Sequence, residues 1–443
     1  MWSQSTDGVV TAPLGPRPGR FSRRSLLRGA AAVGAGAVLG LPWPGMAQQA
    51  DRWPATSSLI DRYVDERKVS GIVAALGLWQ DEPQFIARGR DAFTSPRESD
   101  QNSLYRIYSM TKPITGMAAM MLVDEGRIGL DQPVAEILPA FAQMQVQRVY
   151  DGPLAADNLE PAARPITIRH LLTHTAGLGY GLVQDGPLSD AYREAGLVPG
   201  IVSRLEVPGS FRGTPAESLQ AFADRLATMP LVYQPGTRWS YSVGLDLMGR
   251  IIEVVSAMPF DTFLHERILQ PCGMGSTWFK VPQNEVYRLT ANYLRVRDTL
   301  LPIDQPENSV YLDDPPFPFG GAGLVSSPHD YDRFLQMLLG GGTIDGVRVM
   351  TQEAVRLGTS DLLPDTLLPG AGYREGFGYG AGGLVGKGSA QGLYGWTGAA
   401  GTLGMVNLRT GLRSSLFTQY MPPGAYQLDE EFQRSVAEDF SRR

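Results

Sequence analysis

The chain has 443 residues, a formal net charge of −6 and a single cysteine, Cys272, which excludes an internal disulfide framework. Lysine occurs only at positions 68, 112, 280 and 387, and no basic run follows residue 28. Because nucleic-acid binding depends on clustered positive charge, this composition predicts no nucleic-acid partner.

Residues 1–47 have the pattern of an export signal. Five arginines precede the apolar run 29–41, and Gly45-Met46-Ala47 has the small-x-small pattern of a cleavage site. The apolar run is too short to span a bilayer as a helix. The segment Ser22–Leu27 resembles the twin-arginine signal, with an ordinary secretory signal as the alternative. We therefore expect residues 48–443 to be exported, periplasmic or secreted, with no stable membrane anchor after cleavage.

The part that follows the signal begins with a helix and a hairpin. Apolar residues at helical spacing predict a helix over about 57–68. Segments 71–79 and 84–89 have the composition of strands, and a turn at 80–83 joins them. A polar loop then leads to a further strand at 104–108. Predicted strands therefore precede the first strong sequence signal of a catalytic function.

That signal is the pair Ser109 and Lys112 at the start of an apolar segment. Residues 114–122 have helical spacing, and Pro113 falls in the first turn. Ser109 is therefore expected at the mouth of a buried helix, with Lys112 one turn further on and within reach of its hydroxyl. A desolvated lysine can give up its proton and then activate a serine nucleophile. The structural alternative is a helix cap with a lysine that reaches solvent, although an apolar helix has no structural need for a lysine.

The stretch 109–284 is predicted to be mainly helical. Thr167 caps a short helix that carries His170 and His174 at the spacing of zinc ligands. No glutamate lies between them and no third ligand is evident, so we interpret both as structural and expect no metal site. Residues 180–215 form a long irregular stretch of the kind that covers a functional site. Further helices are predicted over 218–228, 245–256 and 260–269.

The C-terminal part combines one capped helix with several strands. After an irregular stretch over 298–318, Ser327 and Pro328 indicate the start of a helix that ends at Leu339. Strands are predicted over 377–380, 392–396, 402–407 and 414–419, and a last helix over 428–440.

Helices at both chain ends, with antiparallel strands beside them, imply a sheet made from the two ends of the chain. We therefore predict an α/β (α+β) fold in which an antiparallel sheet is flanked by helices. The sheet part takes about residues 55–108 and 285–443, and an all-helical subdomain is inserted between them, at about 109–284.

Four segments together resemble the serine β-lactamase and penicillin-binding-protein superfamily, nearest to the class C β-lactamases and their esterase relatives. They are Ser-Met-Thr-Lys at 109–112, and the stretches 166–177, 233–242 and 320–324. The resemblance extends over about residues 55–440. It implies a β-lactamase-like fold and acyl transfer by a serine nucleophile with a lysine base, without a cofactor.

The resemblance also places the other two motifs of that superfamily, both of them altered. The second motif is Tyr-x-Asn; Tyr241 is kept, but Val243 stands where the asparagine belongs. The third is usually Lys-Thr-Gly on the strand beside the serine. Its best counterpart is Trp396-Thr397-Gly398, and Lys387-Gly388-Ser389 is a weaker candidate. By resemblance, the backbone N–H groups of Ser109 and Ala399 would form the oxyanion hole.

These departures bear on the substrate. An indole carries no charge to bind the carboxylate of a β-lactam, and the esterase relatives share the tryptophan, so a small carboxylic ester is the expected substrate. Ser109 would form the acyl-enzyme, with Lys112 and Tyr241 as a coupled pair of general bases. A β-lactamase or D-amino-acid peptidase activity, or an inactive binding protein of the same fold, remain as alternatives. A Ser-His-Asp hydrolase is disfavoured because Gly-x-Ser-x-Gly does not occur.

Overall fold

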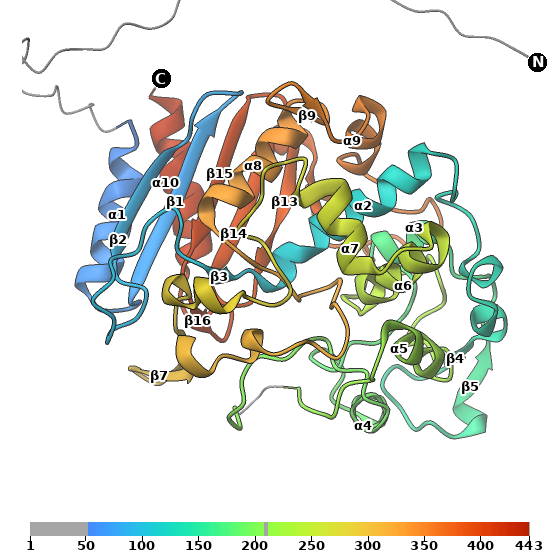
Figure 1. The fold of residues 1–443 in the computed structure, drawn as a ribbon. Helices are drawn as coiled ribbons and strands as arrows, with labels where there is room; N and C mark the ends of the chain where they lie inside the picture. Colours follow the sequence, from blue (N-terminus) through green and yellow to red (C-terminus); the bar gives the residue numbers. More distant parts are fainter. Residues whose placement is uncertain (1–51, 208–210, 443) are drawn as a thin grey trace, which may run out of the picture. The chain divides into compact units, whose positions relative to one another are not determined.

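The structure is a computed structural model that describes residues 52–207 and 211–442 (Figure 1). The predicted export signal, residues 1–47, lies outside the described residues, so it stays a prediction from sequence. Among the helices of the described part, none combines the length and the apolar character that a membrane crossing requires.

A seven-stranded antiparallel sheet lies at the centre of the fold, in the order β11-β12-β13-β14-β15-β1-β2. Its N-terminal strand β1 pairs with the C-terminal strand β15, with Val73 opposite Phe417. The sheet is therefore made from both chain ends, as the sequence predicted. Its strands are β1 (Gly71–Leu78), β2 (Gln84–Gly89), β11 (Phe377–Tyr379), β12 (Leu384–Gly386), β13 (Leu393–Gly398), β14 (Thr402–Asn407) and β15 (Leu412–Phe417).

Helices cover both faces of this sheet (Figure 1). Ile72 and Ala74 of β1 belong to the apolar cluster with α1 (Pro54–Asp65) and α10 (Leu428–Ser441). Val73, which points to the opposite face, packs instead into the cluster that contains α8 (Pro328–Leu339). Because successive side chains of β1 point to opposite faces of the sheet, this strand contributes to both apolar clusters.

A mainly helical part follows strand β3 (Tyr105–Arg106), and the fold class predicted from the sequence is confirmed. One detail differs, because the insert is not all-helical: β4 (Gln145–Gln147) and β5 (Leu159–Pro161) pair within it. Strands of three residues are too short for an alternating pattern to be recognised in the sequence. The helices of this part are α2 (Thr111–Asp124), α3 (Ile168–Leu172), α4 (Pro187–Glu194), α5 (Leu219–Leu226), α6 (Gly244–Ser256) and α7 (Phe260–Leu264), the last continued by a π-helical turn, His265–Leu269.

The stretch 298–318 was expected to be irregular, but it contains strand β7 (Thr299–Asp304), which pairs with β6 (Asn292–Val296). Pro302 lies inside β7 and speaks against a central strand, yet β7 is the edge of its three-stranded sheet, where proline is tolerated. The remaining elements are β8 (Val325–Ser326), β9 (Thr343–Ile344), β10 (Val347–Arg348), α9 (Gln352–Gly358) and β16 (Tyr420–Met421).

Candidate active site

Ser109 lies in a 3₁₀ turn, Tyr108–Met110, between strand β3 and helix α2. The Met110 N–H donates to the Ile107 carbonyl at 3.0 Å, which closes this turn. Helix α2 is buried from Thr111 to Leu122. The serine therefore stands at the entrance of a buried helix, where the sequence placed it.

Lys112 and Tyr241 both reach the Ser109 hydroxyl. The Lys112 Nζ donates to Ser109 Oγ at 3.2 Å, and the Tyr241 hydroxyl donates to the same oxygen at 2.8 Å. Lys112 Nζ also lies 4.6 Å from the centre of the Tyr241 ring. Lys112 has only 1% of its surface exposed. Lys112 of the first motif and Tyr241 of the second thus meet at the hydroxyl oxygen of Ser109.

The sequence analysis missed a buried carboxylate that holds the lysine indirectly, through a backbone peptide group. Lys112 Nζ donates to the Gly321 carbonyl at 2.7 Å, and the Gly321 N–H donates to Asp246 Oδ1 at 2.9 Å. A Cβ at residue 321 would approach Asp246 Oδ2 to 2.7 Å, so glycine permits this contact. Burial raises the pKa of Asp246 to about 6, against the opposing effect of the nearby Lys112 charge. The signal available in the sequence was an aspartate between two leucines in the first turn of a mainly apolar helix.

The raised pKa predicts how stability depends on pH. The folded state holds the Asp246 proton more tightly than the unfolded state, whose pKa is near 3.8. This carboxyl therefore lowers the free energy of unfolding as pH rises from about 4 to about 6. Asp246→Asn removes the titration and keeps an oxygen for the Gly321 N–H. Urea unfolding should show the variant gaining about 2 kcal/mol relative to wild type between about pH 4.5 and pH 7. If the difference in unfolding free energy between the variant and the wild type were the same at both pH values, burial would not raise the pKa of Asp246.

Aromatic rings hold Tyr241 in position. The Trp396 Nε1–H donates to the Tyr241 hydroxyl at 3.2 Å, and the two ring centres are 5.9 Å apart. The His174 ring lies 4.6 Å from the Tyr241 ring on centres. The backbone N–H of Ser242 donates to His174 Nδ1 at 3.2 Å. Burial lowers the pKa of His174 well below its usual range, so this ring is neutral packing against the phenol.

The second histidine of the pair has a local partner. The Thr167 N–H donates to His170 Nδ1 at 3.2 Å, which completes the capping box of α3. Burial lowers the pKa of His170 to about 4. Within residues 52–207 and 211–442, no group of three or more His, Cys, Asp and Glu side chains could hold a metal ion. His170 and His174 each accept a hydrogen bond from a backbone N–H group, of Thr167 and Ser242 respectively.

The third motif lies on β13, beside the serine. Gly398 approaches the Ile107 carbonyl so closely that a Cβ would collide with it. Thr397, between Trp396 and Gly398, is half-buried. The weaker candidate, Lys387, instead pairs with Asp361 at 2.5 Å. Of the two candidates for the third motif, Trp396-Thr397-Gly398 is therefore the one that contacts Tyr241.

An apolar cavity of about 280 Å³ opens next to Ser109. Ala399, which follows β13, also lines it, and none of the lining residues carries a formal charge. The stretch 180–215, predicted to cover a site, supplies Tyr180, Leu182, Pro199, Gly200, Val202, Val207 and Phe211 to its wall. The cavity therefore fits a neutral, apolar group attached to the atom that Ser109 attacks.

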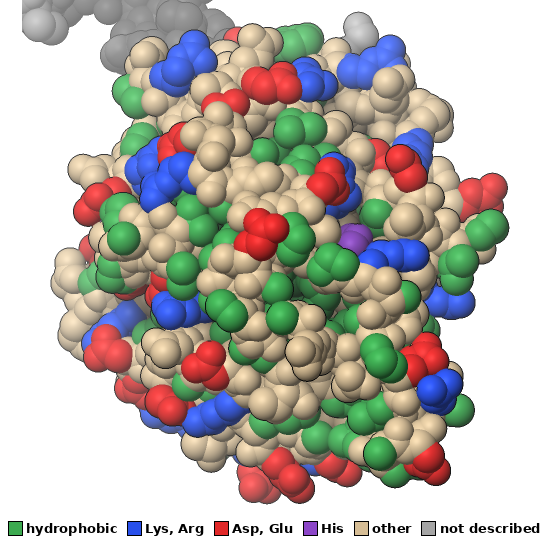
Figure 2. All heavy atoms as spheres, turned by 90° about the vertical axis from the view of Figure 1, so that its right-hand side faces the viewer, with side chains coloured by type: hydrophobic (Ala, Val, Ile, Leu, Met, Phe, Trp, Pro, Cys, Tyr) green, Lys and Arg blue, Asp and Glu red, His purple; other side chains and the backbone are tan. Residues whose placement is uncertain are grey.

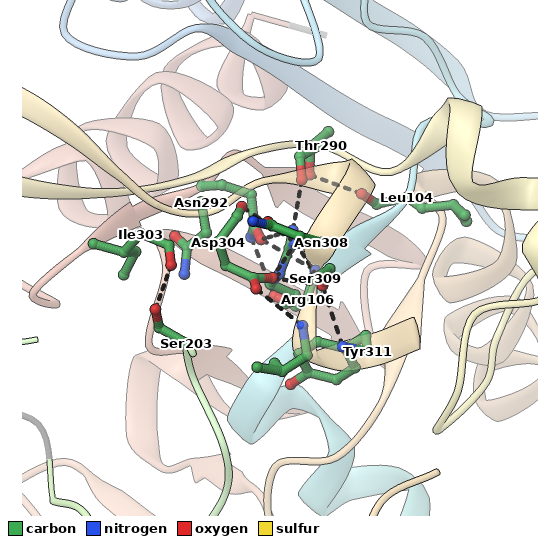
Figure 3. A network of polar contacts seen from close by, with 12 residues as sticks. Leu104, Arg106, Ser203, Thr290, Asn292, Ile303, Asp304, Asn308, Ser309 and Tyr311 are labelled. Atoms are coloured by element: carbon green, nitrogen blue, oxygen red, sulfur yellow. Dashed lines mark hydrogen bonds and ion pairs between the residues drawn. The ribbon is translucent and has the colours of Figure 1, made fainter. Parts of the chain in front are cut away.

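A buried polar network fixes the chain just before Ser109 (Figure 3). Arg106 Nε donates to Asp304 Oδ2 at 2.7 Å, and Arg106 Nη1 donates to the Thr290 carbonyl at 2.6 Å. The Gln419 side chain accepts from the Arg106 N–H at 3.2 Å and donates to the Arg106 carbonyl at 3.1 Å. These bonds tie strand β3 to β7 and to the segment after β15.

The surface differs from the site in its charge. Figure 2 shows the face on the right-hand side of Figure 1, where Lys and Arg side chains are interspersed with Asp and Glu.

Comparison with known proteins gives a family match, two related sequences and one similar solved structure. The sequence matches the Beta-lactamase family over residues 56–438. Protein Rv1367c of Mycobacterium tuberculosis (strain ATCC 25618 / H37Rv) is 40% identical over 60% of this chain and 61% of its own length, so the chain spans less than two thirds of that relative. Esterase EstB of Burkholderia gladioli is 29% identical, over 63% of this chain and 68% of its own. The solved structure of "EstCE1, a hydrolase with promiscuous acyltransferase activity" has a TM-score of 0.69 at 23% identity, covering 87% of this chain and 98% of that one.

Proposed function

Because the chain belongs to the Beta-lactamase family and is a serine hydrolase-like enzyme, we propose that it cleaves small carboxylic esters through an acyl-enzyme on Ser109. The observation that carries the proposal is the contact of the Ser109 hydroxyl with two proton-transferring groups, Tyr241 at 2.8 Å and Lys112 at 3.2 Å. A serine hydroxyl becomes an effective nucleophile when an adjacent base takes its proton.

In the acylation step, Ser109 Oγ attacks the ester carbonyl carbon while its proton passes to the pair of Lys112 and Tyr241. The backbone N–H groups of Ser109 and Ala399 are the proposed donors to the carbonyl oxygen, where one such donor is worth ~2.7–4 kcal/mol in the transition state. The pair returns the proton to the alcohol oxygen as the C–O bond breaks. Water, activated by the same pair, then attacks the acyl carbon and releases the carboxylic acid.

The environment of Trp396 supports an ester over a β-lactam. The indole N–H is occupied by the Tyr241 hydroxyl, and the cavity beside Ser109 has no charged side chain. A penicillin carries a carboxylate that would lack a cationic partner on this strand. The loss of one hydrogen bond to a charged group costs about 1.5–3 kcal/mol, which is roughly 10- to 100-fold in kcat/KM.

The proposal is tested with p-nitrophenyl butanoate and benzylpenicillin on the purified protein. We expect a butanoyl adduct on Ser109 in intact-mass spectra after a rapid quench, mapped by peptide digestion. We expect kcat/KM for benzylpenicillin to be roughly 10- to 100-fold below that for the ester. An adduct on a different residue would refute the assignment of the nucleophile. Equal turnover of the two substrates would favour the β-lactamase alternative.

A further inference from the structure

Tyr108, the residue directly before the candidate nucleophile, has a strained backbone. Its φ is 41°, in the left-handed region where glycine is favoured and a bulky side chain is an outlier. Strain of this kind persists only where the surroundings hold it, and it concentrates at functional sites. Tyr108 is also 5% exposed, so its ring is enclosed in this conformation.

Asn292 holds the Tyr108 side chain. The Asn292 Nδ2 donates to the Tyr108 hydroxyl at 3.0 Å and lies 3.5 Å from Met421 Sδ. Asn292 is fully buried on strand β6, where it pairs with Asp304, the partner of Arg106 in the polar network (Figure 3). One amide on a rigid strand therefore positions two side chains, those of Tyr108 and Met421.

Tyr108 and Met421 are both among the residues that line the apolar cavity, together with Leu294 of strand β6. Ser109 and Ala399 also line the cavity, whereas neither Lys112 nor Tyr241 is among its lining residues. The proton that Lys112 and Tyr241 return must reach the alcohol oxygen, so the alcohol is expected to leave on their side. The cavity then receives the acyl chain.

We propose that Tyr108, positioned by Asn292, sets the size of the acyl group that the enzyme accepts; this inference depends on the proposed ester hydrolysis through Ser109. The cavity beside Ser109 has a volume of about 280 Å³. The uncharged, mainly apolar wall selects a neutral aliphatic chain. The Tyr108 ring occupies volume that longer chains would need, and the backbone strain is the cost of placing it there.

The test compares kcat/KM for p-nitrophenyl esters of acetate, butanoate, hexanoate, octanoate and decanoate. In the wild type, each added methylene should raise kcat/KM by about fourfold until the cavity is full, after which it should fall. Tyr108→Gly removes the ring and relieves the positive φ. It should increase the ratio of kcat/KM for octanoate over acetate at least tenfold, equivalent to roughly two further methylenes.

Two more variants separate the ring from its support. Asn292→Ala releases the Tyr108 hydroxyl and should shift the ratio in the same direction by a smaller factor, because the ring can then move. Tyr287→Ala replaces a tyrosine that is 69% exposed and should leave the ratio at its wild-type value. The ratio compares two substrates on one preparation, so a partly misfolded sample does not change it.

The outcomes distinguish this inference from the proposed function. If the wild type forms the acyl-enzyme on Ser109 but Tyr108→Gly keeps the wild-type ratio, Tyr108 does not set the acyl size. If the wild type hydrolyses none of the esters, the proposed function itself fails. If Tyr108→Gly does not fold, Asn292→Ala decides, and an unchanged ratio in that variant overturns the inference.

Discussion

Replacing Ser109 by alanine should lower kcat for p-nitrophenyl butanoate by roughly 10⁴-fold or more and should abolish the acyl adduct. In the proposed mechanism the hydroxyl oxygen forms the covalent bond, and loss of a nucleophile of this kind removes most of the catalytic effect. Binding should survive, because alanine leaves the walls of the cavity in place. The measurement is steady-state kinetics together with intact-mass spectrometry of the quenched reaction.

Ser58→Ala is the matched control for this experiment. Ser58 is an exposed serine on α1 whose hydroxyl donates only to the carbonyl of Pro54, at 2.9 Å, among the bonds of the described residues. This variant should retain the wild-type kcat and the wild-type adduct. If Ser109→Ala were as active as Ser58→Ala, then Ser109 would not be the nucleophile.

Replacing Tyr241 by phenylalanine should reduce kcat by at least ~10²-fold, the range expected for a general acid–base group. The substitution deletes one oxygen, which donates to Ser109 Oγ at 2.8 Å and accepts from Trp396 Nε1 at 3.2 Å. The ring packing against His174 is kept, so the loss reports on proton transfer. Lys112→Met should cost a similar factor, because Lys112 and Tyr241 are proposed to share one proton.

Tyr379→Phe is the control in the same aromatic cluster. Its ring centre lies 5.2 Å from that of Trp396, and its buried hydroxyl has no hydrogen-bond partner within the described residues. This variant should keep more than half of the wild-type kcat. If Tyr241→Phe also kept more than half, Tyr241 would be only a wall of the site and the second motif would be misplaced.

Short-range patterns were sufficient for much of this architecture. The cap at Thr167, the Ser327-Pro328 start of α8 and the spacing of Ser109 and Lys112 all depend on contacts within three or four residues. Strands β1 and β14 were found as short apolar runs bounded by turns, the pattern of strands that are buried on both faces. The Tyr241 and Trp396 motifs were placed by resemblance to a known family and not by local chemistry.

Tertiary structure alone decided the parts of the site whose partners lie far apart in the chain. Asp246 meets Gly321 across 75 residues, and Tyr108 meets Asn292 across 184. Strand β7 exists only because β6 is beside it, although its own proline argues against a strand. The hydrophobic periodicity of a sequence does not reveal such contacts. Each of them forms only when separate segments have packed together and water has been excluded between them. The sequence therefore determined the pairing of Ser109 with Lys112, whereas only the fold brought together the groups that hold Lys112 and line the cavity.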